Sequence, residues 1–223
     1  MSEAESLLMK RESAMLARWR RRIAYQGALL GVVCAVVALS LLEVDRHTQA
    51  AIAQRRMEDR LASLAQVMPP RWYDNNPLRD VIRVSDAAMG ARPVQVYPAR
   101  RQGVLTAVAF QVVTEGYGGP ITLIMGVDRA GVILGVRVLS HKETPGLADK
   151  IEIAKSSWIT HFNGMSLLNT PPAGWAVKKD GGQIDQFTGA TITPRAMVKG
   201  IHAGMLFFAR HREQFIQTGR SSS

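Results

Sequence analysis

Cysteine is nearly absent from the sequence. Cys34 is the single cysteine among 223 residues, so no disulfide, iron–sulfur cluster or cysteine-based zinc site can form within the chain. It lies in an apolar run, which is typical of an inert small hydrophobe. The five histidines show no spacing typical of metal ligands. We therefore expect no metal site, and any redox chemistry must come from an organic cofactor.

Glycine motifs for nucleotides are also absent. Neither a P-loop nor a G-x-G-x-x-G fingerprint occurs, which disfavours a soluble nucleotide-using enzyme. Basic residues are in excess, with 28 Lys and Arg against 18 Asp and Glu and a net charge of +10. They do not gather beside aromatic residues on one helix or strand, so we expect no nucleic-acid partner. A hydrophobic content of 47% is typical of a globular chain, here one main domain with appendages.

A long apolar run is present near the N-terminus. Residues 23–42 are uncharged, and at about 1.5 Å per residue they match the roughly 30 Å of a hydrocarbon core. We predict a single transmembrane helix there. A cleaved signal peptide is the alternative, since small residues follow at 48–50. The run exceeds the roughly 7–15 residues of a signal core, and Glu43 and Asp45 follow it.

Charge on either side of this run predicts its orientation. A basic cluster at 18–22 precedes the run and acidic residues follow it, so residues 1–22 are expected in the cytoplasm and the rest outside it. The margin is modest, because Arg46, Arg55, Arg56 and Arg60 lie near the far end.

Residues 43–70 are predicted to form an amphipathic connecting helix that Pro69 and Pro70 end. Apolar residues recur in it at helical spacing: Ile52, Met57, Leu61, Leu64 and Met68. Such a stripe is more typical of packing than of a ligand site.

Residues 71–217 are predicted to form an α+β domain. Residues 69–98 read as loops and short elements. The β-branched runs 104–114, 121–127 and 132–139 follow, and short turns join them, which predicts antiparallel strands. Trp158, Phe162 and Trp175 are interpreted mainly as core, and the tail 218–223 as disordered.

The most informative stretch is 185–193, where hydroxyls and tiny side chains precede a helix. We predict that Thr193 is the N-cap of a helix running from Pro194 through Phe208. Free amides and the helix dipole would then favour an anion beside Thr191. Gly189 and Ala190 leave its hydroxyl accessible. From these residues alone, an ordinary capped turn remains the alternative.

Asp185, two further residues and then Thr188-Gly189-Ala190-Thr191 resemble the D-x-x-[ST]-G-A-T flavinylation motif. That motif belongs to the G subunit of Rnf electron-transport complexes and the related C subunit of Na⁺-translocating NADH:quinone reductases. The resemblance implies FMN joined to Thr191 by a phosphoester, which a separate flavin transferase makes from FAD with Mg²⁺. Thr188, Gly189 and Ala190 would contact the cofactor. Asp185 would serve recognition by the transferase or orient the loop.

Two further segments carry the same resemblance. Residues 116–120 are similar to the Gly-Tyr-Gly-Gly loop of Rnf G subunits, and 141–150 to their H-x-E-T-P-G-L loop, with Ala148 in place of an expected glycine. The resemblance implies that the second loop borders the flavin and that Tyr117 lies near it. In isolation each segment is just a turn. The residues expected at the border are Glu143, Thr144, Gly146 and Leu147. Lys178 is expected either to pair with the phosphate or reduced flavin, or to form a solvated ion pair.

The resemblance implies an electron-relay subunit rather than an independent catalyst. Such a subunit is anchored in the bacterial inner membrane with its main domain in the periplasm, beside other membrane and iron–sulfur subunits. The complex moves electrons between ferredoxin and NAD, coupled to Na⁺ or H⁺ transport. Two alternatives stay open: a quinone-reductase C-like flavoprotein, and a non-redox anchored scaffold that holds an unmodified anion.

Overall fold

The computed structural model describes residues 3–218, with side chains described from residue 25 onward apart from those at 47, 50, 51, 53 and 56. The chain divides into two units, residues 1–57 and 58–223. Helix α1 (Glu3–Val67) begins in the first unit and ends in the second. The predicted span and the predicted connecting helix are therefore segments of one helix, which ends just before Pro69 as expected.

The first unit contains the apolar run. Tyr25–Arg46 has a mean hydropathy of 2.4 and is long enough to cross a membrane. Its side chains are exposed although most are apolar, with Leu30 and Leu39 among them. That combination is what a lipid-facing helix requires, and a signal sequence near an N-terminus shares it.

The second unit is built on an antiparallel sheet in the order β1-β2-β3-β4-β5. The predicted α+β class is confirmed, and so are the three predicted strands. The strand bounds are β1 (Ile82–Val84), β2 (Val94–Arg101), β3 (Val104–Glu115), β4 (Pro120–Asp128) and β5 (Ile133–Ser140).

The expectation of only loops and short elements up to residue 98 was wrong for β2. Proline lacks the amide that a sheet ladder needs, yet Pro98 lies within this strand. It sits at the edge beyond the three-residue β1, and its carbonyl accepts from Asn75 Nδ2 at 3.1 Å. The Arg100 amide donates to Asn75 Oδ1 at 2.8 Å. The backbone of Pro98 therefore makes no hydrogen bond to β3 that would need an amide. On the other side of the strand, the Asn75 side chain takes the place of a neighbouring strand.

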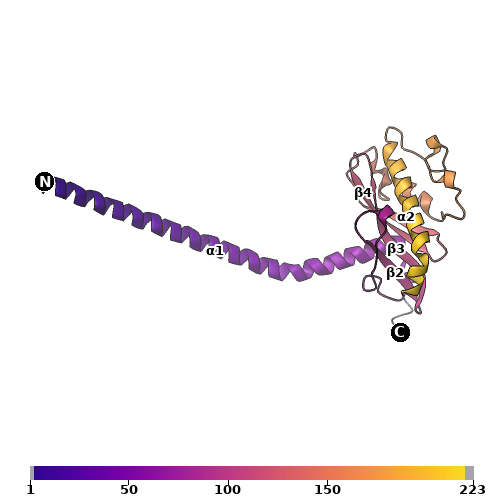
Figure 1. The fold of residues 1–223 in the computed structure, drawn as a ribbon, viewed down its shortest axis with the longest axis horizontal. Coiled ribbons are helices and arrows are strands. Elements are labelled where there is room, and N and C mark those ends of the chain that lie inside the picture. Colours follow the sequence, from indigo (N-terminus) through magenta and orange to yellow (C-terminus); the bar gives the residue numbers. More distant parts are fainter. Residues whose placement is uncertain (1–2, 219–223) are drawn as a thin grey trace. The chain divides into compact units, whose positions relative to one another are not determined.

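Successive residues of the strands face two different layers, because side chains alternate across a sheet. Val108 and Phe110 pack with the second long helix, α2 (Ile192–Gln217), in the larger core. Ala107 and Ala109 face the other side, where they pack with Leu64 and Met68. In Figure 1, α2 is the yellow helix that lies across β2 and β3.

The end of α1 approaches the sheet closely. A Cβ on Gly126 of β4 would overlap the Val67 carbonyl, and one on Gly135 of β5 would lie 3.2 Å from the Val67 Cα. Two glycines side by side on the sheet therefore make room for the helix backbone. Of the predicted apolar stripe, Leu64 and Met68 are buried, whereas Ile52 and Met57 are exposed. Val67, outside that stripe, is fully buried.

Short helices and loops connect β5 to α2. The 3₁₀ helices of the second unit are η1 (Pro70–Trp72), η2 (Ala87–Met89), η3 (Asp149–Ile151), η4 (Ser157–Phe162), η5 (Pro172–Gly174) and η6 (Lys178–Asp180). Trp158, Phe162 and Trp175 are buried as predicted. Of the predicted tail, Thr218 closes α2 by a bond from its amide to Gln214, and 219–223 lie outside the described residues.

Candidate functional site

The motif residues before α2 form a tight turn anchored in the core. The Ala190 amide donates to the Phe187 carbonyl at 3.2 Å, and Gly189 takes a left-handed φ of +81° that suits glycine. Phe187 is buried and its ring lies 5.0 Å from that of Trp158. The Trp158 indole also donates to the Asp185 carbonyl at 2.7 Å. The segment that leads into the turn is therefore anchored to Trp158 at Asp185 and at Phe187.

The start of α2 differs from the prediction. The helix begins at Ile192 and its N-cap is Thr191, whose side chain makes no capping bond. Thr193 is not the cap, because its hydroxyl donates instead to the buried carboxylate of Glu143. The helix continues to Gln217, beyond the expected Phe208. Thr191 thus stands at the helix entrance with its hydroxyl uncommitted to a cap.

Glu143 joins the three motif segments. One carboxylate oxygen accepts from the Gly118 amide at 2.9 Å, and the other accepts from the Thr193 hydroxyl. These partners are 25 and 50 residues away in the sequence. Glu143 is only 4% exposed, and it forms no ion pair within the described part of the chain. Its two hydrogen bonds are what offset its burial.

The glycines of the 116–119 loop make this junction possible. A Cβ on Gly118 would overlap the Lys142 carbonyl, and one on Gly116 would overlap the Glu143 carboxylate. Any larger residue would push the two loops apart. The loop is therefore glycine-rich because another segment packs directly on its backbone.

A cavity of about 330 Å³ opens where these segments meet. It is lined by Tyr117, Thr144, Leu147, Ala148, Gly189, Ala190, Thr191, Ile192 and Thr193. Pockets for small ligands usually measure about 300–1,000 Å³, so its size suits a compact organic ligand. Six residues predicted for the site line it together: Tyr117, Thr144, Leu147, Gly189, Ala190 and Thr191.

Five other predicted residues lie outside the lining. Glu143 is behind the wall, and the Gly146 amide donates to Asp149 Oδ2 at 2.9 Å. Thr188 is exposed on the turn. The Lys178 ammonium pairs with Asp185 at 2.7 Å, with both side chains more than half exposed. An exposed ion pair of this kind contributes little to stability.

The cavity is lined by apolar side chains and by side chains that carry hydroxyls. Tyr117, Leu147 and Ile192 are 72%, 47% and 50% exposed. The hydroxyls of Thr144, Thr191 and Thr193 belong to lining residues, and no lining residue carries a charge. The first amides of α2 have no acceptor within the helix and carry the positive end of its dipole. The arrangement suits a flat aromatic group beside a phosphate.

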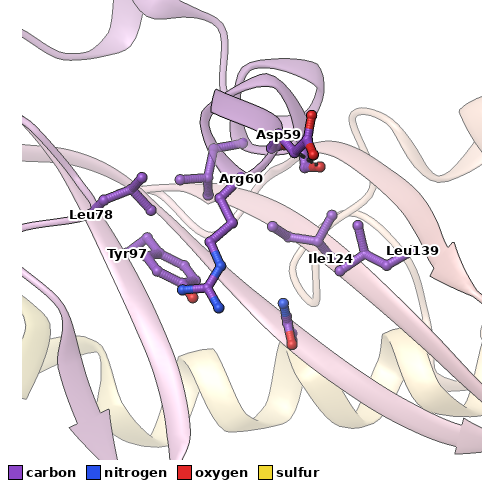
Figure 2. Close-up of a pocket in the computed structure, with 9 residues that line it drawn as sticks. Asp59, Arg60, Leu78, Tyr97, Ile124 and Leu139 are labelled. Carbon is purple, nitrogen blue, oxygen red and sulfur yellow. Dashed lines mark hydrogen bonds between the residues drawn. The ribbon is translucent and has the colours of Figure 1, made fainter. Parts of the chain in front are cut away.

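A second cavity lies on the opposite face of the sheet, where the end of α1 crosses the strands. It measures about 120 Å³, and Arg60, Tyr97 and Ile124 are among its lining residues. Figure 2 shows Arg60 reaching past Tyr97 over the strands. It contains none of the predicted site residues and is too small for a typical cofactor.

Sequence reasoning missed several residues of the site. Ala148 and Ile192 line the cavity, and Thr193 and Gly118 hold Glu143. Ala148 has a negative φ of −101° with ψ −9°, which does not require glycine, so an alanine is accommodated there. The run of glycines at 116–119 was an available signal that another segment approaches closely.

The chain is similar to known proteins along most of its length. The family model of the FMN-binding domain matches residues 116–205, which include all of the cavity lining. The G subunit of the ion-translocating oxidoreductase complex of Stutzerimonas stutzeri is 57% identical over 196 residues, covering 88% of this chain and 85% of the relative. The corresponding protein of Cereibacter sphaeroides is 52% identical over 198 residues, covering 89% and 90%. The crystal structure of Shewanella oneidensis NqrC is 20% identical, with a TM-score of 0.42 over 72% of this chain and 74% of that one.

The second unit thus contains an FMN-binding domain, and the matched residues include all three motif segments. The chain belongs to the family of G subunits of ion-translocating oxidoreductase complexes. The family predicted from the three motifs is confirmed.

Proposed function

We propose that the chain carries FMN covalently on Thr191 and relays electrons as a subunit of an Rnf-type ion-translocating complex. The observation that carries the proposal is the position of Thr191. Its side chain lines the cavity that all three motif segments border, at the entrance of a 26-residue helix. The FMN-binding domain match supports the choice of cofactor.

The cavity residues have separate roles toward the cofactor. The first amides of α2 would stabilise the phosphate, since an anion at a helix N-terminus is favoured. Tyr117, Leu147 and Ile192 offer apolar surface to the ring, and the Thr144 hydroxyl offers a hydrogen bond. FMN supplies the electron-carrying chemistry, and the protein supplies position and electrostatics. Glu143 acts indirectly, by holding the wall together.

Attachment requires a group transfer to the Thr191 hydroxyl. A bond forms between Thr191 Oγ1 and the flavin-side phosphorus of FAD, and the phosphoanhydride bond breaks. AMP leaves with the electron pair, and the hydroxyl proton is released. A flavin transferase with Mg²⁺ would catalyse this step, with Asp185 as part of its recognition surface or as an orienting group. The small side chains at 189 and 190 leave room for that enzyme.

Intact-mass measurement of protein from its native membrane tests the proposal. We expect a mass increase of FMN less one water, localised to the peptide containing Thr191, and retained flavin fluorescence on a denaturing gel. Thr191→Ala should lose both signals. Thr160→Ala, in η4 outside the cavity, is the matched control and should keep them. An unmodified Thr191 peptide from cells that contain the transferase would favour the scaffold alternative.

The family supports partners in a multi-subunit complex. The expected partners are membrane and iron–sulfur subunits, with electrons passing between ferredoxin and NAD and driving Na⁺ or H⁺ transport. A quinone-reductase C-like role is the second candidate. The purified complex separates the two, because reduction of NAD by ferredoxin supports the first role and reduction of quinone by NADH supports the second.

We further propose that Tyr25–Arg46 anchors the chain in the inner membrane with the FMN-binding domain in the periplasm. Protease added to intact spheroplasts should digest the domain, and protease added to inverted vesicles should leave it whole. The reverse pattern would contradict the orientation. Release of the chain by an alkaline carbonate wash would contradict the anchor.

A further inference from the structure

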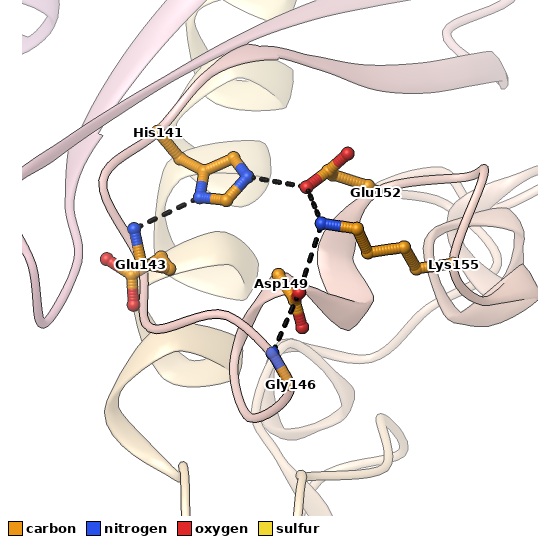
Figure 3. A network of polar contacts seen from close by, with 6 residues as sticks. All are labelled: His141, Glu143, Gly146, Asp149, Glu152 and Lys155. Carbon is orange, nitrogen blue, oxygen red and sulfur yellow. Dashed lines mark hydrogen bonds and ion pairs between the residues drawn. The ribbon is translucent and has the colours of Figure 1, made fainter.

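The loop from His141 to Asp149 is held, on the side away from the cavity, by a row of polar and charged side chains. Thr144, Leu147 and Ala148 of this loop line the cavity. His141, Glu152, Lys155 and Asp149 do not line it. Figure 3 shows the four side chains linked by polar contacts, with the Glu143 amide joined to His141 and the Gly146 amide joined to Asp149. Any influence of these four side chains on the cavity must therefore pass through the loop.

His141 makes two hydrogen bonds that define its protonation. Its Nδ1 lies 3.0 Å from the Glu143 amide, and its Nε2 lies 2.9 Å from Glu152 Oε1. A backbone amide can only donate, so Nδ1 must be the unprotonated nitrogen. Nε2 therefore carries the hydrogen and donates to the Glu152 carboxylate. The two contacts together fit the tautomer that carries its hydrogen on Nε2.

Lys155 connects the two ends of the loop. It pairs with Asp149 at one end and with Glu152, which contacts His141 at the other. Its ammonium lies 2.7 Å from Glu152 Oε1 and 3.0 Å from Asp149 Oδ2. Asp149 Oδ2 also accepts from the Gly146 amide at 2.9 Å. The bond from Gly146 and then that from Lys155 lower the pKa of Asp149, and Lys155 followed by His141 lowers the pKa of Glu152. Both carboxylates are thus held in the charged form that these contacts require.

We propose that His141, oriented by Glu152 and Lys155, is a positioning residue of the cofactor cavity. Its Nδ1 holds the Glu143 amide, and this places the Glu143 carboxylate between Gly118 and Thr193. Among the residues whose side chains are described, Glu143 forms no ion pair, so its placement depends on such hydrogen bonds. The influence of His141 on a bound flavin rests on the proposed function. Its influence on the position of Glu143 does not depend on any bound flavin.

Two substitutions of His141 separate its role as a hydrogen-bond acceptor from its role in occupying space. In His141→Asn, the side-chain oxygen can accept from the amide two residues on, as asparagine commonly does. In His141→Leu, no acceptor remains. In the full-length protein, we expect the Glu143 amide to exchange with deuterium about tenfold faster in the leucine variant and at a nearly unchanged rate in the asparagine variant. The visible circular dichroism of the attached flavin should change only in the leucine variant. Equal behaviour of the two variants would overturn the proposal.

Nitrogen-15 NMR of the imidazole gives a second, independent test. At neutral pH we expect the His141 proton on Nε2 alone in the wild type, and a detectable population protonated on Nδ1 in Glu152→Leu, where no side-chain acceptor remains to hold the ring in this orientation. A proton on Nδ1 in the wild type would overturn the proposal. Exchange and NMR are to be repeated in Thr191→Ala, which lacks the attachment hydroxyl. If the exchange contrast persists there while no flavin is found on the wild-type protein, the proposed function fails and the role of His141 stands.

Discussion

At the scale of single residues, Glu143 is the one that connects the motif segments through its hydrogen bonds to Gly118 and Thr193. It is a buried carboxylate with two hydrogen-bond donors, one from a backbone amide and one from a hydroxyl. A buried charge that loses a donor retains its desolvation cost without compensation. The donors of Glu143 should therefore be more sensitive to substitution than the exposed residues of the cavity rim.

Thr193→Val tests this sensitivity, because it removes the hydroxyl and nearly keeps the volume. We expect a loss of about 1–3 kcal/mol in the free energy of unfolding, measured with urea. Thr193→Ser keeps the donor and should lose clearly less. A valine variant as stable as the serine variant would show that the hydroxyl does not compensate Glu143.

The misplacement of Thr193 as an N-cap shows the limit of local reasoning. Threonine before proline is a valid capping pattern, and nothing nearby in the sequence competes with it. The competing acceptor is Glu143, 50 residues earlier. That Thr191, Thr144, Leu147 and Tyr117 share a cavity was predicted through family motifs. The hydrogen bonds that bring the motifs together carry no local signal.

At the scale of elements, helix α2 is fastened to the loop after β1. Asp86 caps η2 through the Ala88 amide at 2.8 Å. Its other carboxylate oxygen accepts from Arg210 Nη2 at 2.7 Å and from His211 Nε2 at 3.0 Å. Arg210 is the main cause that lowers the pKa of Asp86 below its ordinary value of 3.8. One carboxylate thus connects a loop, a short helix and α2.

This pairing predicts a pH-dependent stability. Because the pKa of Asp86 is lower in the folded state, its contribution is full above about pH 3.8 and is lost as the pH falls through the folded value. Asp86→Asn should lower the melting temperature at neutral pH, and the difference from wild type should shrink to nothing in strong acid. Asp185→Asn, which removes an exposed pair, is the control and should change little. A constant difference across pH would contradict the assignment.

The strands with a clear run of β-branched residues were predicted correctly. The strand whose formation depends on contacts distant in the sequence was not. The strands β3, β4 and β5 are β-branched runs between short turns, and they were predicted within a residue or two. Strand β2 was missed because Pro98 interrupts its pattern. Only the edge position and Asn75 make that proline acceptable.

At the scale of the whole molecule, the end of α1 belongs to the FMN-binding unit. Leu64, Val67 and Met68 are nearly or fully buried against the sheet. The division between the two units falls between Met57 and Glu58, inside α1 rather than at its end. The last turns of this helix therefore form part of the domain's second core.

Two truncations test this boundary. Residues 58–223 should fold as a soluble domain, whereas residues 69–223 should be less stable by several kcal/mol, since burial of each large apolar side chain contributes about 1.5–3 kcal/mol. Urea unfolding followed by tryptophan fluorescence measures the difference. Leu64→Ala within 58–223 is the milder variant and should cost about 2–5 kcal/mol. Equal stability of the two fragments would show that the domain begins after α1.

The junction at Glu143 also has a consequence for assembly. Its partners are 25 and 50 residues away, on a loop between strands and on the last helix. A newly made chain therefore has no such junction until α2 has docked on the completed sheet. If FMN is attached to Thr191 as proposed, attachment would therefore be restricted to folded molecules. In a nascent or partly folded chain, Thr191 lacks the cavity around it.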